Sequence, residues 1–279
     1  MLATRREAAS AGMEFDRLIE AAEAAADAAA AVIRPMFRSR AGSLPRADLK
    51  SDNSPVTIAD REAERTMRAI LSGFFPEHGI LGEEFGLDRP DARLRWVLDP
   101  IDGTRAFITG RPTFGTLIAL MDGETPLLGL IDQPVTGERW VGAIGRATRF
   151  TGPLGGKAGC RPCRDLADAE LSCTSPAMLD GDLIAGWQRL ADAARRVSWG
   201  GDCYAYGLLS LGQIDIVAEG DMKVWDWAAL VPVVEGAGGR VTDWRGAPLC
   251  THGISNVLAV GSPELLPAAV SLLSTATPD

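Results

Sequence analysis

Two aspartates lie close together in the segment 96–104 (WVLDPIDGT), at the point where an apolar run ends. Residues 96–98 predict a buried strand that ends at Asp99, because Pro100 has no N–H with which to continue a central ladder. Asp102 follows on the same turn. Two carboxylates held on one turn suit Mg²⁺, which takes oxygen ligands and is completed by substrate phosphate and water. The spacing therefore predicts a divalent-metal site at the end of this strand, where ligands collect in open α/β sheets.

Six further acids lie beside glycines, at expected strand ends or at helix starts: Asp60, Glu83, Glu84, Asp202, Glu219 and Asp226. For each one alone, a surface or helix-capping role is the simpler interpretation. A convergent cluster is different, because two charges ~4 Å apart at an effective dielectric constant of ~20 repel by roughly 4 kcal/mol. Such a cluster needs cations or strongly raised pKa values.

The composition is ordinary for a soluble globular protein. The chain has 279 residues, of which 46% are hydrophobic and 23% charged, and its net charge is −9. This negative charge argues against an extended surface for nucleic acid or anionic membranes. No apolar run approaches the ~20 residues that a membrane span needs. The charged N-terminus shows no signal peptide, so a cytoplasmic location is expected.

The cysteines do not predict a disulfide framework. The chain has an odd number of them: Cys160, Cys163, Cys173, Cys203 and Cys250. A C-x-x-C motif is formed by Cys160 and Cys163, but a zinc or redox role needs a second pair or histidines nearby. The chain has only His78 and His252, so a structural role is favoured and the function of the motif stays open.

The N-terminal half alternates helices and β-structure. Helical spacing of apolar residues predicts a helix from Glu14 to about Phe37, a loop over 38–56, and a second helix that starts at a capping box on Thr57 and ends near Phe75. Beyond the strand at 96–99, the hairpin signal Asp122-Gly123 joins two expected strands, and a third follows. These strands are expected at 116–121, 127–131 and 139–144.

The C-terminal half reads as alternating strands and helices after a glycine-rich hinge or hairpin at 152–159. The expected elements are helices at 183–194 and 226–237, strands at 214–218, 240–244 and 256–260, and a last helix after Ser262. We therefore expect a flexible tail at 1–12, an α+β half at 13–150 that carries the metal motifs, and an α/β half at 151–279 that carries substrate-recognition residues.

The chain resembles the inositol monophosphatase superfamily of Mg²⁺-dependent phosphomonoesterases. The resemblance spans nearly all of the sequence after the tail. It rests on motifs in the family's order and approximate spacing: Gly82-Glu83-Glu84, Asp99-Pro100-Ile101-Asp102-Gly103-Thr104, and Trp225-Asp226 before Ala228-Ala229. Gly236, Gly238 and Gly239 fit the family's glycine pattern after that helix.

The resemblance implies a five-layer αβαβα sandwich, a homodimer, and two to three Mg²⁺ ions between the two halves. Glu83, Asp99 and the Ile101 carbonyl would hold one ion. The second ion would lie between Asp99, Asp102 and Asp226, and Glu83 would also touch a third. Asp226 would border the substrate as well.

The same resemblance assigns the catalytic groups. Asp60 and Thr104 would orient and deprotonate the attacking water, and the amides of Gly103 and Thr104 would face phosphate oxygens. No cysteine or histidine nucleophile is needed, because phosphoryl transfer depends mostly on positioning and charge stabilisation. Two positions depart from the pattern of many relatives: Val224 stands where proline is expected, and Ala106 where asparagine is frequent.

Several stretches look most like the histidinol-phosphatase branch, among them 114–120, 129–134, 138–142, 201–206 and 227–236. Histidinol phosphate carries an ammonium group and an imidazole, so its pocket should present carboxylates away from the metals. Asp202 and Glu219 are the candidates, and Trp199, Tyr204 and Tyr206 are aromatic residues that could stack on imidazole.

The expected reaction is therefore Mg²⁺-dependent hydrolysis of histidinol phosphate. Two alternatives stay open. One is an inositol-1-phosphatase or broad sugar-phosphate phosphatase, because Glu219 could equally accept inositol hydroxyls. The other is a binding protein without activity, against which the complete set of acids and Thr104 argues.

Overall fold

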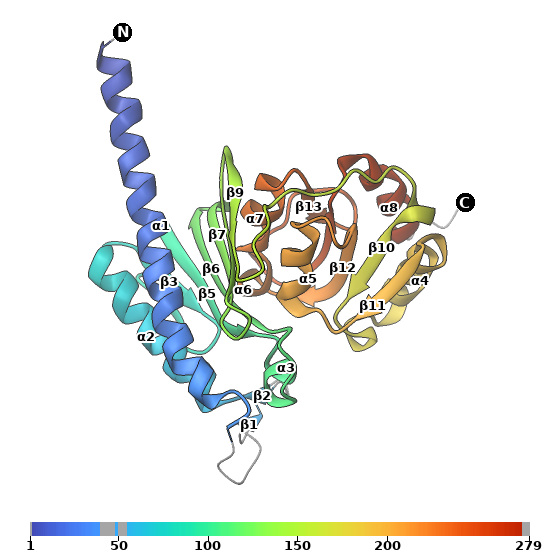
Figure 1. Cartoon of the computed structure of the whole chain (residues 1–279), viewed down its shortest axis with the longest axis horizontal. Helices are drawn as coiled ribbons and strands as arrows, with labels where there is room; N and C mark the ends of the chain where they lie inside the picture. The colour runs from blue at the N-terminus through green and yellow to red at the C-terminus, as the bar shows by residue number, and fades with distance from the viewer. Residues whose placement is uncertain (1, 40–47, 50–54, 275–279) are drawn as a thin grey trace.

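The computed structural model describes residues 2–39, 48–49 and 55–274. The elements stack in five layers (Figure 1), which confirms the expected αβαβα sandwich. The outer helices on one side are α1 (Leu2–Met36) and α2 (Ile58–Phe74). Three helices lie between the two sheets: α5 (Asp202–Leu209), α6 (Val224–Trp227) and α7 (Leu230–Gly236). The far side is covered by α4 (Gly181–Ala193) and α8 (Leu266–Leu273).

The first sheet has seven strands in the order β4-β3-β5-β6-β7-β8-β9. All neighbours are antiparallel except β3 and β5, which run parallel. The strands are β3 (Gly79–Gly82), β4 (Gly86–Asp88), β5 (Leu94–Asp102), β6 (Gly115–Asp122), β7 (Thr125–Gln133), β8 (Glu138–Ala143) and β9 (Arg146–Thr151). The hairpin expected at Asp122-Gly123 is confirmed, with Gly123 in the left-handed region at φ 60°.

The second sheet has five strands in the order β11-β10-β12-β14-β13, with β10 parallel to both of its neighbours. The strands are β10 (Glu170–Cys173), β11 (Arg196–Trp199), β12 (Ile216–Met222), β13 (Arg240–Asp243) and β14 (Ser255–Val260). The smaller elements are β1 (Asp48–Leu49), β2 (Pro55–Val56), α3 (Thr104–Ile108), η1 (Leu166–Asp168), η2 (Pro176–Met178) and η3 (Pro263–Leu265).

The central helices pack directly against the first sheet, and two glycines permit this. A Cβ atom on Gly129 of β7 would lie 2.0 Å from the Ala229 carbonyl oxygen. On Gly142 of β8 it would lie 2.2 Å from the Pro232 oxygen. Any larger residue would push α7 away from the sheet, and with it α6, which carries Asp226. The close packing of α7 on the sheet thus fixes how far Asp226, a candidate metal ligand, lies from the first sheet.

Three elements differ from the sequence predictions. The first helix begins at Leu2 rather than near Glu14, because alanine, arginine and glutamate favour helix there; its first turns project beyond the sheet (Figure 1). The helix expected over 226–237 is broken after Trp227, since Pro232 cannot donate to the carbonyl four residues earlier. The expected loop at 38–56 contains the short β1–β2 pair, and its residues 40–47 and 50–54 lie outside the described part.

The strand predicted to end at Asp99 continues to Asp102, so that prediction is wrong in its boundary. Proline does interrupt the ladder, because the pairing of β5 with β6 shifts register between these two aspartates. The Pro100 carbonyl accepts a hydrogen bond from the buried hydroxyl of Thr116 at 2.8 Å. The sequence signal for a turn therefore corresponds to a β-bulge, which keeps the strand in the sheet while redirecting its side chains.

Candidate active site

Two acids meet where the parallel strands β3 and β5 end. Gly82, the last residue of β3, pairs with Leu98 of β5, and the N–H of Glu83 donates to the Leu98 carbonyl at 3.2 Å. Glu83 therefore follows β3 at the level where Asp99 follows Leu98. Carboxyl ends of parallel strands lie at one edge of a sheet, so this pair of acids results directly from the strand register.

The bulge and helix α6 complete the acid cluster. Carboxylate oxygens of Asp99, Asp102 and Asp226 all lie within 4.8 Å of one another. Asp99 is braced by the Ile101 N–H at 3.0 Å, and Asp102 by the N–H of Cys203 at 2.6 Å. The N–H of Lys223 donates to Asp226 at 2.7 Å. These three backbone donors hold the carboxylates in place despite their mutual repulsion.

The electrostatics of this cluster fit a divalent cation. Burial, followed by the charges of Glu83 and Asp102, raises the pKa of Asp99 well above its ordinary value. Burial and then Glu83 raise the pKa of Asp226 to about 7. Buried carboxylates that repel one another in this way are stabilised by a bound cation, and an all-oxygen set suits Mg²⁺. The residues present thus match the cofactor that the sequence predicted.

The predicted water-activating pair is also assembled. Asp60 lies in the first turn of α2, where it accepts the N–H of the cap residue Thr57 at 2.8 Å. The Thr104 hydroxyl lies 3.4 Å from Asp60 Oδ1 and 3.2 Å from the Ile101 oxygen, and either can accept its proton. Burial raises the pKa of Asp60, with Glu83 adding to the effect. A carboxylate whose pKa is raised is a stronger base than an ordinary aspartate, which suits a proton acceptor.

One organising residue escaped the sequence analysis. Glu64 on α2 is fully buried and accepts the N–H groups of Glu84 at 2.8 Å and Phe85 at 3.3 Å. Its charge is balanced by Arg68, which donates to it at 2.7 Å. Gly82 leaves the space for it, since a Cβ there would lie 1.9 Å from Glu64 Oε1. The helical (i, i+4) spacing of Glu64 and Arg68 was a visible signal, but nothing in the sequence showed that the pair faces inward.

A small cavity of about 160 Å³ opens beside the acid cluster. Its lining includes Asp102, Asp226, Asp202 and Glu219. Glu219 is buried and accepts the Thr174 N–H at 2.7 Å and the Tyr206 hydroxyl at 3.0 Å. The cavity thus brings the two predicted recognition acids next to two predicted metal ligands.

Asp202 lies at the first position of α5 with a left-handed φ of 46°. Its N–H donates to the Thr174 hydroxyl at 2.8 Å, so Thr174 joins both recognition acids. Burial and then Glu219 raise the pKa of Asp202 to about 7, while Arg111 and Arg105 act in the opposite direction. Thr174 and these two arginines were not singled out from the sequence, because their relevance depends on contacts between distant segments.

Of the three aromatic residues considered for imidazole stacking, only Tyr206 lines the cavity. Trp199 is 46% exposed and packs on Trp187, with ring centroids 4.6 Å apart. Tyr204 donates its hydroxyl to Glu138 and packs edge-on against Trp140. The structure therefore assigns Trp199 and Tyr204 to packing rather than to the cavity.

Comparison with known proteins agrees with this geometry. A family model described as the inositol monophosphatase family matches residues 14–276. The chain belongs to the inositol monophosphatase family. It is thus a metal-dependent phosphomonoesterase of a family whose members depend on Mg²⁺ and act on small phosphorylated substrates.

Individual relatives of this family member come from both expected branches. It is 43% identical over 269 residues to the bifunctional phosphatase IMPL2, chloroplastic, of Arabidopsis thaliana, covering 93% of this chain and 76% of that protein. It is 38% identical over 236 residues to a histidinol-phosphatase of Mycobacterium tuberculosis, covering 81% and 88%. The structure of an inositol monophosphatase from Zymomonas mobilis matches with a TM-score of 0.83 and 47% identity, covering 93% and 98%.

None of the helices in the described part of the chain combines the length and apolar character needed to cross a membrane.

Proposed function

We propose that this family member hydrolyses L-histidinol phosphate to L-histidinol and phosphate, a step of histidine biosynthesis. The observation that supports this substrate is the cavity in which Asp202 and Glu219 lie beside the metal-binding acids. Both are carboxyl groups outside the predicted metal set. An ammonium group and an imidazole on the substrate would offset their charges, whereas a neutral polyol would not.

The metal-binding set in this proposal is that expected from the sequence. Glu83, Asp99 and the Ile101 carbonyl would hold one Mg²⁺, Asp99, Asp102 and Asp226 would hold a second, and Glu83 would border a third. Bound Mg²⁺ would neutralise the phosphate, lower the pKa of water and stabilise the leaving alkoxide. The protein contributes the fixed carboxylates, of which Asp99, Asp102 and Asp226 each accept a hydrogen bond from a backbone N–H.

The chain's own groups orient the nucleophile and the phosphate. The Thr104 hydroxyl, placed between Asp60 and the Ile101 carbonyl, accepts a hydrogen bond from water while it donates to Asp60. Asp60 then receives the proton through Thr104. Phosphate oxygens face the amides of Gly103 and Thr104, because the first N–H groups of α3 have no acceptor within that helix.

The non-phosphate part of the substrate lies between Glu219, Asp202 and Tyr206. Glu219 is held by the Thr174 N–H and the Tyr206 hydroxyl, so its orientation is set before substrate arrives. Pre-organised carboxylates lower the ordering cost of binding a cation. Asp226, which lines the same cavity, borders both the metal and the alcohol part of the substrate.

A second candidate is hydrolysis of inositol-1-phosphate or related sugar phosphates. Glu219 and Asp202 could accept hydroxyl groups, and the Zymomonas mobilis relative, at 47% identity, is described as an inositol monophosphatase. Steady-state kinetics with saturating Mg²⁺ separate the two. We expect kcat/KM for histidinol phosphate to exceed that for inositol-1-phosphate by about 100-fold, the worth of a charged hydrogen bond at about 3 kcal/mol. An equal or higher value for inositol-1-phosphate would exclude the first candidate.

Three further expectations belong to this proposal: a homodimer, two to three Mg²⁺ per active site, and a cytoplasmic location. The Arabidopsis relative is described as chloroplastic. Light scattering tests the dimer, and calorimetric titration with Mg²⁺ tests the number of ions.

A further inference from the structure

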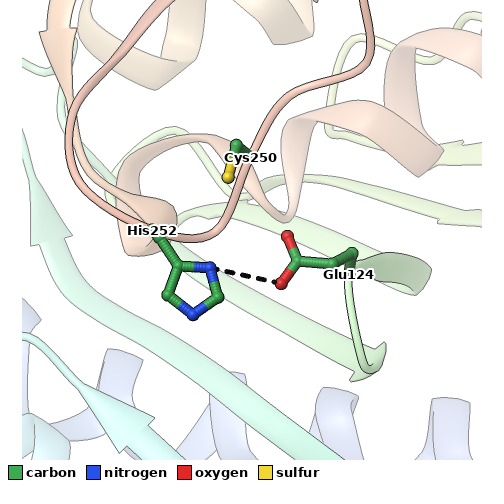
Figure 2. Close-up of side chains that lie close together, drawn as sticks. All are labelled: Glu124, Cys250 and His252. Carbon is green, nitrogen blue, oxygen red and sulfur yellow. Dashed lines mark ion pairs between the residues drawn. The ribbon is translucent and has the colours of Figure 1, made fainter.

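Among the residues that the structure describes, two groups of three side chains could each hold a metal ion. One is the acid cluster of the active site. The other consists of Glu124, Cys250 and His252, all exposed, each with one ligand atom within 4.8 Å of those of the other two. Figure 2 shows the thiol, the imidazole and the carboxylate gathered around one point. We name this group the Glu-Cys-His triad.

The triad is remote from the active site. Glu124 lies in the β6–β7 hairpin turn, and Asp122 before it pairs with Leu94 at the start of β5. Asp102 lies at the other end of β5 and pairs with Gly115. At about 3.3 Å per strand residue, the two ends are on the order of 25 Å apart. A ligand of the triad therefore does not occupy the substrate cavity.

We propose that the Glu-Cys-His triad binds Zn²⁺. A thiolate, an imidazole and a carboxylate form the mixed donor set that Zn²⁺ accepts, whereas Mg²⁺ requires oxygen ligands. Three protein ligands leave the fourth tetrahedral position to water. Binding replaces the Cys250 S–H bond by a sulfur–zinc bond and releases that proton to solvent. His252 binds through a deprotonated ring nitrogen, so a protonated imidazole also releases its proton to solvent and its ion pair with Glu124 is lost.

The ligands are held together before any metal arrives. The Thr251 N–H donates to Glu124 Oε2 at 2.9 Å, and the Thr251 hydroxyl also donates to this carboxylate. His252 Nδ1 lies 3.6 Å from Glu124 Oε1 (Figure 2). A simple clamp between the two loops would need only Glu124, Thr251 and His252. Cys250 is not needed to hold the two loops together, but its thiol adds a third possible metal ligand to Glu124 and His252.

Metal binding at this position would join the two sheets. Glu124 belongs to the turn between β6 and β7 of the seven-stranded sheet, and the other two ligands to the loop between β13 and β14 of the five-stranded sheet. A ligand that binds only the folded state raises the melting temperature in proportion to the logarithm of its concentration. In this proposal the triad cross-links the two sheets when Zn²⁺ is bound, so its contribution to stability depends on the Zn²⁺ concentration.

Co²⁺ spectroscopy of the whole protein in saturating Mg²⁺ tests this proposal, because a thiolate ligand gives a near-ultraviolet charge-transfer band that carboxylates do not. We expect this band at one equivalent of Co²⁺ in the wild type and its loss in Cys250→Ser. Cys160→Ser, from the C-x-x-C motif, is the matched control and should keep the band. Competition with a chromophoric chelator should show Zn²⁺ affinity falling at least about 10–100-fold in His252→Gln and Glu124→Gln.

Absence of the band in the wild type would overturn the proposal, and so would its persistence in Cys250→Ser. Unchanged Zn²⁺ affinity in both His252→Gln and Glu124→Gln would do the same. Glu124→Gln keeps an oxygen that can accept from Thr251, so an affinity loss there reports on the ligand rather than on the loop clamp. Mg²⁺-dependent phosphatase activity should be unchanged in Cys250→Ser, which separates this test from that of the proposed substrate.

Discussion

The side chain of Asp202 lies directly against the backbone of Gly103. A Cβ on Gly103 would be 2.7 Å from Asp202 Cγ, and both residues have left-handed backbone angles, φ 87° and 46°. A non-glycine residue held in this region costs about 1–3 kcal/mol, and such strain clusters at functional sites. The contact joins the segment that carries the candidate metal ligands Asp99 and Asp102 to the start of α5. In the proposed reaction, this contact would set where a substrate held by Asp202 lies relative to the metals.

The Gly103→Ala variant should distinguish the effect of this contact on activity from the effect of backbone strain on stability. We expect kcat/KM to fall about 100-fold, because displacing Asp202 or the turn by ~1 Å misplaces the reacting groups. Gly123→Ala is the matched control, since Gly123 also has a left-handed φ of 60° but nothing within 4 Å of an added Cβ. Both variants should lose stability in thermal melts, and only Gly103→Ala should lose activity. Equal activities would show that the contact has no role in the reaction.

Asp99→Asn should abolish turnover and yet stabilise the metal-free protein. The substitution removes a ligand that the proposal assigns to two ions, a loss of several kcal/mol of transition-state stabilisation or about 1000-fold in kcat. It also removes a buried charge that Glu83 and Asp102 repel, which raises the metal-free melting temperature. Asp122→Asn, at the far end of β6, is the control. A lower metal-free melting temperature in Asp99→Asn would contradict the repulsion argument.

Asp202→Asn should act on the substrate rather than on the chemistry. Asparagine keeps the size of the side chain against Gly103 but removes its negative charge. We expect kcat/KM for histidinol phosphate to fall about 10–100-fold, the worth of a hydrogen bond to a charged group. The value for p-nitrophenyl phosphate should change less than about twofold. Matching losses on both esters would assign Asp202 to the metal site instead of to recognition.

Glu64→Gln tests whether the loop that carries Glu83 is positioned from α2. Loss of the buried charge weakens the hydrogen bonds to the N–H groups of Glu84 and Phe85. We expect Mg²⁺ affinity to fall about 10–100-fold, as is usual for residues behind metal ligands. Glu62→Gln, on the same helix but bonded to exposed Arg65, should bind Mg²⁺ as the wild type does. Calorimetric titration measures both.

Mg²⁺ binding should release protons at pH 7. Burial raises the pKa of Asp226 to about 7, above the ordinary value of ~3.9. When the folded state has the higher pKa, the carboxyl group contributes stability below its unfolded pKa. This contribution is lost as the pH rises through the folded pKa. The metal-free melting temperature should thus fall as the pH rises from about 4 to about 7, between the ordinary and the folded pKa of Asp226. Because Mg²⁺ needs the ionised form, its stabilising effect should grow over the same range.

Titration calorimetry in two buffers of different ionisation enthalpy measures this proton release directly. The apparent enthalpy should differ between the buffers at pH 7, and the contribution of Asp226 to this difference should vanish by pH 9, well above its pKa of about 7. Identical enthalpies in both buffers at pH 7 would show that the acid cluster is fully ionised before the metal binds.

Local signals were sufficient where the partners are near in sequence. The capping box of Thr57 and Asp60 and the Asp122-Gly123 hairpin were predicted correctly, because their hydrogen bonds close within a few residues. The break before α7 was missed, although Pro232 was visible, because the sequence also offered a continuous apolar helical face. Pro100 was interpreted as the end of a strand, but the neighbouring β6 retained the chain through a bulge.

The sequence alone indicated the reaction class, because the acids and Thr104 of the segment 99–104 occur with Glu83 and Asp226 in the order of the inositol monophosphatase family. Only the tertiary structure decided which residues pack around this segment. Glu64 bonds to the loop that carries Glu83, and Asp202 packs against Gly103. Tyr206, and not Trp199, lines the cavity. The tertiary structure also brought Glu124 to His252 from a separate loop. Such contacts depend on strand register and on layer packing, which act over distances that no local pattern records.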